Sequence, residues 1–356
     1  MSRVGAVVLS AGAWSQASHL PGLAAHPSVD LLALSSPDRA RAAGLAAEFR
    51  TKGLTDWREA LAFGPDIAVV SSPPVAHEEM VVAALEAGAH VLVEKPFATS
   101  HAAACRMHEA AARCGKVLLI GFGWPASPIF GLTRRLIEAG EVGPVEHLAM
   151  HLAVNTRALL QGGTDGGWGG AETNAATYSD PSVSGGGAAA VSMSHQLGLI
   201  CWLLDDRIER ITAQTHPPGQ RMDLHVASVA TFRKGGSAAI SCASTHPYMA
   251  RPQWHMALYG GAGQILLNSV GDRLRLVRAD GEIEEFGGLE ARGEYDPTAP
   301  TKALIDCALG QAAPVALSSA LAAHVVAVTD AIYDSARSGT TVTVPAETRI
   351  SERQGQ

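Results

Sequence analysis

Short apolar runs alternate with alanine-rich stretches of helical character from Val4 to Gly121. The apolar runs have the length and composition of buried strands, and they are Val4–Leu9, Leu31–Leu34, Ile67–Ser71, Val91–Val93 and Val117–Gly121. The stretches between them predict helices at Arg39–Phe49, His77–Ala87 and His101–Cys114. Strands that alternate with helices of this length indicate βαβ units, and hence an α/β domain with a doubly wound parallel sheet.

The pattern changes after Pro125. A helix, a long strand, a glycine-rich loop and a second helix are predicted at Ile129–Ala139, Val145–Val154, Gln161–Gly187 and Ala188–Leu204. Hairpin-like runs follow at Ala227–Phe232, Ala238–Ala243, Trp254–Tyr259, Ile265–Asn268 and Leu274–Arg278, before a helix near Ser319–Ser338 and a strand at Thr341–Val344. We therefore expect the doubly wound domain at residues 1–124, an α+β domain with a mostly antiparallel sheet at 125–346, and a frayed tail at 347–356.

The composition narrows the class of protein. Of the 356 residues, 47% are apolar and 17% are charged, which is enough for two buried cores and carries no signature of disorder. The net charge of −7, without a basic stripe, argues against nucleic acid as a partner. Five scattered cysteines without metal-like pairing, no signal peptide and no uninterrupted apolar run of membrane length predict a cytoplasmic protein that engages neither metal nor membrane.

One predicted strand delivers a charged pair to its carboxyl end. The sequence Val91–Phe97 reads Val-Leu-Val-Glu-Lys-Pro-Phe, so Glu94, Lys95 and Pro96 follow a buried strand directly. In an open α/β sheet, ligands bind in the crevice beyond the strand carboxyl ends. A lysine held there is a candidate for proton transfer, because burial and neighbouring charges shift its pKa readily. The alternative is a solvent-exposed lysine that ends a strand.

The turn after the first strand is a candidate for binding a dinucleotide. At such a turn, a Gly-x-Gly-x-x-Gly sequence lets the backbone approach a pyrophosphate at a helix N-terminus. The aligned stretch here is Ser10-Ala11-Gly12-Ala13-Trp14-Ser15, which keeps only the close-approach glycine between two serines. We predict that Ser10, Gly12, Ala13 and Trp14 contact a cofactor; an ordinary strand–turn–helix connection is the alternative.

The end of the second strand bears on the choice of cofactor. An acidic residue at this point would bind the ribose hydroxyls of NAD, whereas Ser35 and Ser36 stand here, with Arg39 close behind. A hydroxyl beside a guanidinium suits a 2′-phosphate, which mildly favours NADP. In the alternative, the serines cap a helix and Asp38 reaches the ribose.

Two prolines follow the run Ile67–Ser71. The sequence Ser72-Pro73-Pro74 gives a rigid loop in which the prolines offer no N–H donors, suited to lie against a nicotinamide ribose. We predict that Ser72, Pro73 and His77 lie on the cofactor side.

The chain resembles the glucose–fructose oxidoreductase / inositol dehydrogenase (Gfo/Idh/MocA) family from Val4 to Val344. The resemblance rests on the order and spacing of Ser72-Pro73-Pro74-x-x-His77, Ala87-Gly88, Val91–Pro96, Ile137–Gly143 and Gly185-Gly186-Gly187 before His195. It implies an N-terminal Rossmann domain and a C-terminal α+β domain whose large open sheet is used to form homodimers or homotetramers. It also implies a tightly held NAD(H) or NADP(H) and a small-molecule sugar or cyclic polyol as substrate.

The resemblance further implies the catalytic groups. Lys95 matches the lysine that contacts the reacting hydroxyl, with Glu94 and Pro96 shaping the nicotinamide side, and His195 matches the histidine after the triple glycine. The family places an aspartate one helical turn before this histidine, where this chain has Val191. Because valine carries no proton, Lys95 and His195 would share the hydroxyl proton, in roles that the sequence leaves open. A satisfied core histidine is the alternative for His195.

Further residues are candidates for substrate contact. Tyr178 lies on the glycine-rich loop, which is predicted to fold over the substrate, or else it anchors that loop. Asn155 and Arg157 end the first strand of the second domain, where they reach sugar hydroxyls or are solvated. Trp168 stacks on a sugar face or only pins the loop.

The predicted function is hydride transfer between NAD(P) and a secondary hydroxyl or ketone of a sugar, sugar derivative or cyclic polyol. One alternative is a redox-neutral glycosidase that oxidises the sugar, eliminates the aglycone and reduces the product. The other is a nucleotide- or sugar-sensing protein without catalysis. Val191 keeps this last alternative open, whereas retention of Lys95 and His195 argues against it.

Overall fold

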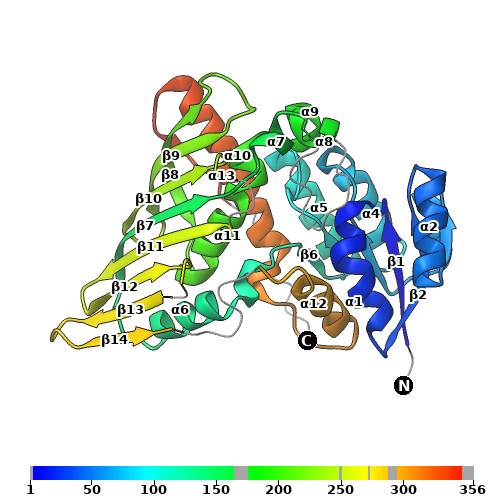
Figure 1. The fold of residues 1–356 in the computed structure, drawn as a ribbon, viewed down its shortest axis with the longest axis horizontal. Coiled ribbons are helices and arrows are strands. Elements are labelled where there is room, and N and C mark those ends of the chain that lie inside the picture. Colours follow the sequence, from blue (N-terminus) through cyan, green and yellow to red (C-terminus); the bar gives the residue numbers. More distant parts are fainter. Residues whose placement is uncertain (1–2, 164–174, 248–250, 272, 288–294, 347–356) are drawn as a thin grey trace.

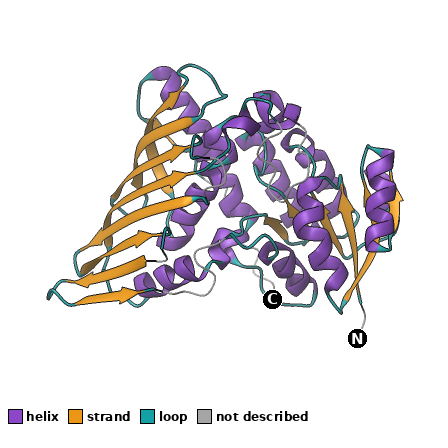
Figure 2. Cartoon of the chain, viewed as in Figure 1, coloured by secondary structure: helices purple, strands orange, loops and turns teal. Residues whose placement is uncertain are grey.

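A computed structural model describes residues 3–163, 175–247, 251–271, 273–287 and 295–346 of the chain. Two sheets organise these residues, one six-stranded and one nine-stranded, and helices are packed between them (Figures 1 and 2). The expected fold class is confirmed: a parallel Rossmann-type sheet at the N-terminus is followed by a large, mostly antiparallel sheet.

The six-stranded sheet is parallel throughout, in the order β3-β2-β1-β4-β5-β6. Its strands are β1 (Val4–Leu9), β2 (Val29–Ser35), β3 (Lys52–Leu54), β4 (Ile67–Val70), β5 (His90–Val93) and β6 (Leu118–Ile120). Every residue of β1 and β4 is buried, as expected for a parallel sheet that is covered on both faces. The strand order reverses between β1 and β4, so a ligand crevice is expected beyond the carboxyl ends of these two strands.

Helices connect these strands. They are a π-helical turn (Ser15–His19), α1 (Leu20–Ala25), α2 (Arg39–Phe49), α3 (Trp57–Leu61), α4 (His77–Glu86) and α5 (His101–Cys114), with a 3₁₀ turn at Pro74–Ala76. The predicted bounds of α2 and α5 are confirmed to the residue. The prediction missed β3, α3 and the first helical segment. β3 is a largely exposed edge strand, so it lacks the apolar run that marks a buried one.

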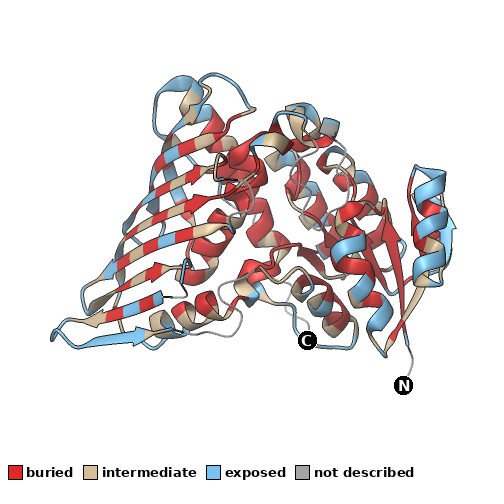
Figure 3. Cartoon of the chain, viewed as in Figure 1, coloured by how far each residue is buried: buried red, intermediate tan, exposed pale blue. Residues whose placement is uncertain are grey.

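The nine-stranded sheet has the order β14-β13-β12-β11-β7-β10-β9-β8-β15, in which only β7 and β10 are parallel neighbours. Its strands are β7 (Val145–Ala153), β8 (Ile208–His216), β9 (His225–Phe232), β10 (Ser237–Ala243), β11 (Gln253–Gly260), β12 (Gly263–Asn268), β13 (Arg273–Arg278), β14 (Ile283–Phe286) and β15 (Val342–Thr343). Buried and exposed residues alternate along β9 and β10 (Figure 3), the pattern of a sheet covered on one face. β8 and β14 lie outside the predicted runs.

The remaining helices are α6 (Pro128–Glu138), α7 (Arg157–Leu160), α8 (Ala175–Ser179), α9 (Pro181–Ser184), α10 (Ala188–Val191), α11 (Met193–Leu204), α12 (Ala299–Ala308) and α13 (Ser319–Ser338), with 3₁₀ turns at Trp124–Ala126 and Val315–Leu317. Two predictions need correction. The segment 161–187, predicted as a loop, contains α8 and α9, and the helix predicted at Ala188–Leu204 is interrupted at Ser192. α12 was not predicted.

The last two long helices return to the N-terminal sheet. α12 packs against β4 and β5, and α13 packs against α5 and β6 as well as β8. Apolar side chains of both sheets therefore share one continuous core. In Figure 1, α6, α11 and α13 lie against one face of the nine-stranded sheet, and no described helix covers the other face. Within the described segments, no single helix is long and apolar enough to cross a membrane. The bent pair Pro181–Val191 and Met193–Leu204 reaches the length and apolar composition of a membrane span only when its two parts are taken together.

Candidate active site

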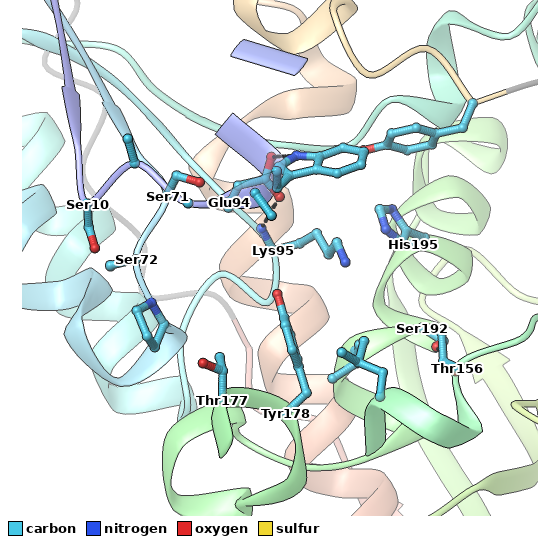
Figure 4. A pocket seen from close by; sticks show the side chains of 18 of the residues that line it. Ser10, Ser71, Ser72, Glu94, Lys95, Thr156, Thr177, Tyr178, Ser192 and His195 are labelled. Carbon is cyan, nitrogen blue, oxygen red and sulfur yellow. Dashed lines mark hydrogen bonds between the residues drawn. The ribbon is translucent and has the colours of Figure 1, made fainter. Parts of the chain in front are cut away.

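A cavity of about 470 Å³ lies between the two sheets, beyond the carboxyl ends of β1, β4 and β5. Figure 4 shows Ser10 and Ser72 on one side, His195 and Thr156 on the other, and Lys95 between them. The cavity is lined by Ser10, Ala11, Gly12, Ala13, Trp14, Ser36, Pro37, Asp38, Arg41, Ser71, Ser72, Pro73, Glu94, Lys95, Trp124, Leu152, Val154, Thr156, Leu159, Thr177, Tyr178, Val191, Ser192, His195, Pro252 and Tyr295. These residues lie at the crevice that the topology of the parallel sheet predicts.

The loop after β1 faces this cavity. Ser10 has a left-handed backbone (φ 60°), and its N–H donates to the Oγ of Ser35 at 3.0 Å. Ser35 thus fixes the loop from outside the cavity lining, whereas Ser10, Gly12, Ala13 and Trp14 line it. A Cβ added at Gly12 would meet no atom within 4 Å, so the backbone there presents open space to an incoming group.

The Glu94 carboxylate is turned toward this loop. Its Oε1 accepts hydrogen bonds from Trp14 Nε1 at 2.8 Å and from His19 Nε2 at 2.9 Å, and its Oε2 accepts from the Lys95 N–H at 3.1 Å. His19 Nδ1 lies 2.7 Å from the Oγ1 of Thr301 on α12. Burial raises the pKa of Glu94, but the hydrogen bond and charge of His19 and the charge of Lys95 outweigh it, so the pKa is lowered and the carboxylate is ionised.

The Lys95 side chain extends into the cavity (Figure 4). Within the described part of the chain, its ammonium has neither a hydrogen bond nor an ion pair, because the neighbouring Glu94 carboxylate is held by Trp14 and His19. Burial lowers the pKa of Lys95, and the charge of Glu94 opposes this effect only in part. Lys95 thus has unused hydrogen-bond donors and a reduced cost of deprotonation.

His195, on α11, faces Lys95 across the cavity (Figure 4). Its ring packs between Phe122 and Tyr295, at centroid distances of 5.3 and 5.6 Å. Its Nδ1 is buried and has no hydrogen-bond partner among the described residues. Burial and the charge of Lys95 lower the pKa of His195 to about 3, and the charge of Glu94 opposes them only in part. At neutral pH, His195 is therefore an uncharged imidazole.

His77 supports the cavity without lining it. Its Nε2 lies 2.9 Å from the carbonyl oxygen of Ser72 and its Nδ1 lies 3.1 Å from that of Phe97, and burial lowers its pKa. His77 therefore connects the loop of Ser72 and Pro73, which line the cavity, to the chain that follows the cis Lys95–Pro96 peptide. Pro96 also lies outside the lining of this cavity.

The residues after β2 line one end of the cavity. Ser36 and Asp38 lie there, and the Asp38 Oδ1 accepts from the N–H groups of Ala40 at 2.8 Å and Arg41 at 3.2 Å, so this carboxylate caps α2. Arg39, which the sequence predicted for this end, is not among the described lining residues, and Arg41 takes its place.

Only some of the residues predicted to contact the substrate line the cavity. Tyr178 lines the cavity, and burial raises its pKa to about 12, so its hydroxyl stays protonated and can donate a hydrogen bond. Asn155 and Arg157 are not among the described lining residues: Asn155 forms an isolated β-bridge with Thr245, and Arg157 is exposed at the start of α7. Trp168 lies outside the described residues.

Several lining residues were not predicted. Alternate residues of β7 are buried. Leu152 and Val154, two positions apart, line the cavity, and the next position in this alternation is Thr156, which also lines it. The alternation along the strand could therefore have identified Thr156. Its Oγ1 lies 3.3 Å from the Oγ of Ser192. No sequence signal points to Tyr295, which reaches the site from far along the chain.

Across the described ranges, no group of three or more His, Cys, Asp or Glu side chains could hold a metal ion.

Residues 5–122 match a family described as "Oxidoreductase family, NAD-binding Rossmann fold", and residues 130–266 match the "GFO/IDH/MocA C-terminal domain". A dTDP-3,4-didehydro-2,6-dideoxy-alpha-D-glucose 3-reductase from Streptomyces antibioticus is 36% identical over 132 residues, which are 36% of this chain and 40% of that protein. Inositol 2-dehydrogenase 2 from Saccharopolyspora erythraea is 36% identical over 119 residues, 31% of this chain and 34% of that protein. The chain thus spans well under two thirds of the length of these relatives.

The fold is shared with solved structures over nearly the whole chain. A structure of levoglucosan dehydrogenase in complex with NADH and L-sorbose has a TM-score of 0.80 and 19% identity, covering 97% of this chain and 100% of that one. The two family matches join the Rossmann sheet and the nine-stranded sheet that follows it in one known architecture. The chain therefore belongs to the GFO/IDH/MocA family of oxidoreductases.

Proposed function

We propose that this chain is an NAD(P)-dependent oxidoreductase that interconverts a secondary hydroxyl and a ketone on a sugar, sugar derivative or cyclic polyol. The observation that carries the proposal is the Lys95 ammonium, which enters the cavity beside the Ser10–Trp14 loop and has no partner among the described residues. The relatives named as an inositol dehydrogenase and a deoxyglucose reductase support the substrate class.

The residues present fit a dinucleotide. The open backbone at Gly12 leaves room for a pyrophosphate, and the Ser72 Oγ is buried in the cavity wall without a hydrogen-bond partner in the described chain. Ser10, Gly12 and Trp14 would hold the phosphate side, and Ser72 with Pro73 the nicotinamide side. When bound, the nicotinamide supplies hydride transfer.

The protein's part of the chemistry is to hold and move the hydroxyl proton. A protonated Lys95 donates to a ketone oxygen during reduction, and a neutral Lys95 accepts the proton during oxidation. His195 is uncharged, so it orients and polarises the same oxygen through a hydrogen bond. Val191 adds no proton-carrying group to the wall beside them.

We propose NADP as the preferred cofactor. Ser36 stands where an acidic residue would select the NAD ribose, and the nearby Asp38 carboxylate caps α2. Arg41 supplies the guanidinium that a 2′-phosphate requires.

We also propose a homodimer or homotetramer that forms through the uncovered face of the nine-stranded sheet. Val229 on β9 and Tyr259 on β11 are 58% and 41% exposed there. Apolar side chains of this size on an open sheet face favour contact with a second copy. The test is the mass of the purified protein by light scattering.

One experiment tests the main proposal. The purified chain is denatured, any released nucleotide is identified, and sugars, inositols and glycosides are screened for cofactor reduction and for bond cleavage. We expect cofactor reduction by a secondary alcohol, lowered at least a hundredfold in Lys95→Met, because general acid–base catalysis contributes about 10²–10⁴-fold. Failure to bind NAD or NADP would refute the proposal, and glycoside cleavage without net cofactor reduction would favour the glycosidase.

A further inference from the structure

One wall of the cavity is built from aliphatic side chains. Leu152 lies at the end of β7 and Val154 directly after that strand, Leu159 comes from α7 and Val191 from α10, and all of them line the cavity. Each is buried in the chain, with at most 8% of its surface exposed. Three separate elements therefore converge to give one apolar surface on the side of the cavity formed by the second sheet and its helices.

Apart from the His195 imidazole, which faces the reacting oxygen in the proposed reaction, the polar side chains named here on the same side end in hydroxyls. They belong to Thr156, Thr177, Tyr178 and Ser192, and those of Thr156 and Ser192 lie within hydrogen-bond distance of each other at 3.3 Å. Of the described lining residues, none on this side carries an amide, carboxylate or guanidinium group. A ring with a hydroxyl on every carbon needs more donors and acceptors than these side chains offer.

Apart from Lys95, the charged lining residues lie away from this wall. Asp38 and Arg41 belong to the end of the cavity after β2, and Asp38 caps α2. The Glu94 carboxylate is held by Trp14 and His19. Lys95 alone offers charge to the substrate, and it faces the reacting carbinol in the proposed reaction.

We propose that the substrate presents a deoxygenated face to Leu152, Val154 and Val191, and that it is a deoxysugar or a similarly reduced ring rather than a fully hydroxylated sugar or inositol. This inference rests on the proposed function and narrows its substrate class. A hydroxyl buried against these side chains loses its water partners and gains none, whereas a methyl or methylene group gains burial. One unmatched hydroxyl is worth about 10–100-fold in kcat/KM.

The test uses matched pairs of alcohols. Methyl α-D-glucopyranoside is compared with its 2-deoxy and 6-deoxy forms, and myo-inositol with cyclohexane-1,2-diol, each with saturating NADP or NAD. We expect the best deoxygenated substrate to exceed its hydroxylated partner by about 10–100-fold in kcat/KM. Val191→Thr places a hydroxyl in the wall at nearly constant volume and should narrow that ratio about tenfold. Val226→Thr is the control, since Val226 on β9 is equally buried, at 2% exposure, and does not line the cavity.

The outcomes distinguish a failure of the deoxygenated-substrate inference from a failure of the proposed oxidoreductase function. Equal rates, or a preference for the hydroxylated partners, would overturn the inference and leave the oxidoreductase intact. If no pair is turned over, dissociation constants for the same alcohols are measured by tryptophan fluorescence on the cofactor-bound protein, and equal affinities within each pair overturn the inference. A protein that binds neither NAD nor NADP would overturn the proposed function itself. If Val226→Thr lowers the ratio of kcat/KM between deoxygenated and hydroxylated substrates as much as Val191→Thr does, the aliphatic wall is not the cause of the preference.

Discussion

Asp223 is a fully buried carboxyl group behind the helices that carry the site. Its Oδ1 accepts from the Tyr333 hydroxyl at 2.7 Å and its Oδ2 accepts from the Ala189 N–H at 3.0 Å, so it holds the start of α10, the helix that leads to His195. Burial raises the pKa of Asp223 to about 6, although the hydrogen bonds from Tyr333 and Ala189 act in the opposite direction. We predict that this residue makes the stability of the fold depend on pH.

The size of the effect follows from the raised pKa. A change from the ordinary value of 3.8 to about 6 means that protonation of Asp223 stabilises the folded state by about 3 kcal/mol relative to the unfolded state. This stabilisation is complete below about pH 4 and is lost as the pH rises through about 6. The free energy of unfolding of the native protein should therefore fall by about 3 kcal/mol over this range relative to Asp223→Asn, whose side chain does not titrate.

The assay is urea unfolding followed by tryptophan fluorescence at several values between about pH 4 and about pH 7. Tyr333→Phe serves as a second variant, because it removes a hydrogen bond that favours the ionised carboxylate. In that variant the loss of stability should shift to higher pH. Parallel pH dependences for the native protein and Asp223→Asn would refute the reasoning.

Arg41→Ala should weaken NADP binding about 10–100-fold and leave NAD binding unchanged, since it removes a charge-assisted contact to the 2′-phosphate; equal losses for both cofactors by calorimetry would contradict the assignment. Gly12→Ala should leave thermal unfolding unchanged, because its Cβ meets no atom within 4 Å, yet raise the dissociation constant for either cofactor. Gly187→Ala should instead lower the stability by about 1–3 kcal/mol, because its Cβ would lie 2.2 Å from the carbonyl oxygen of Asp223; unchanged urea unfolding would contradict this. The rate of oxidation should rise with pH and the rate of reduction should fall, and both changes should follow the titration of Lys95, whose pKa is lowered. Profiles of rate against pH that do not differ between the two directions would exclude Lys95 as the proton carrier.

The fold was predictable wherever burial leaves a periodic trace in the sequence. β1, α2, α5 and α13 have their predicted bounds because their apolar positions and caps are local signals. β3 and β14 are sheet-edge strands with mostly exposed residues, so no apolar run marks them. The break at Ser192 is invisible locally, because every residue of Ala188–Val191 and all but a few of Met193–Leu204 are buried, and a helix buried on all sides has no amphipathic period.

The site was predictable at the ends of parallel strands and less so beyond them. Ser10, Ser72 and Lys95 line the cavity because the sheet brings its carboxyl ends together, a consequence of topology that the order of elements already implies. Residues of the second domain were harder to place. Asn155 carries the amide that suits sugar hydroxyls, but strand alternation favours its neighbour Thr156, which lines the cavity. Tyr295 reaches the cavity through tertiary packing that has no local signature.

Glu94 and Lys95 are adjacent in sequence but serve different parts of the molecule. Their side chains separate just beyond β5: the carboxylate accepts hydrogen bonds from Trp14 and His19, whereas the ammonium lies in the cavity. The carboxylate is therefore unable to neutralise the lysine by a direct ion pair, and it acts on it only through space. Together with the uncharged His195, this leaves Lys95 as the group whose charge changes as a proton moves to or from the substrate oxygen. Its burial lowers the energy needed for deprotonation, and the ionised Glu94 keeps the ammonium from losing its proton too readily, so that both proton states are accessible to one residue.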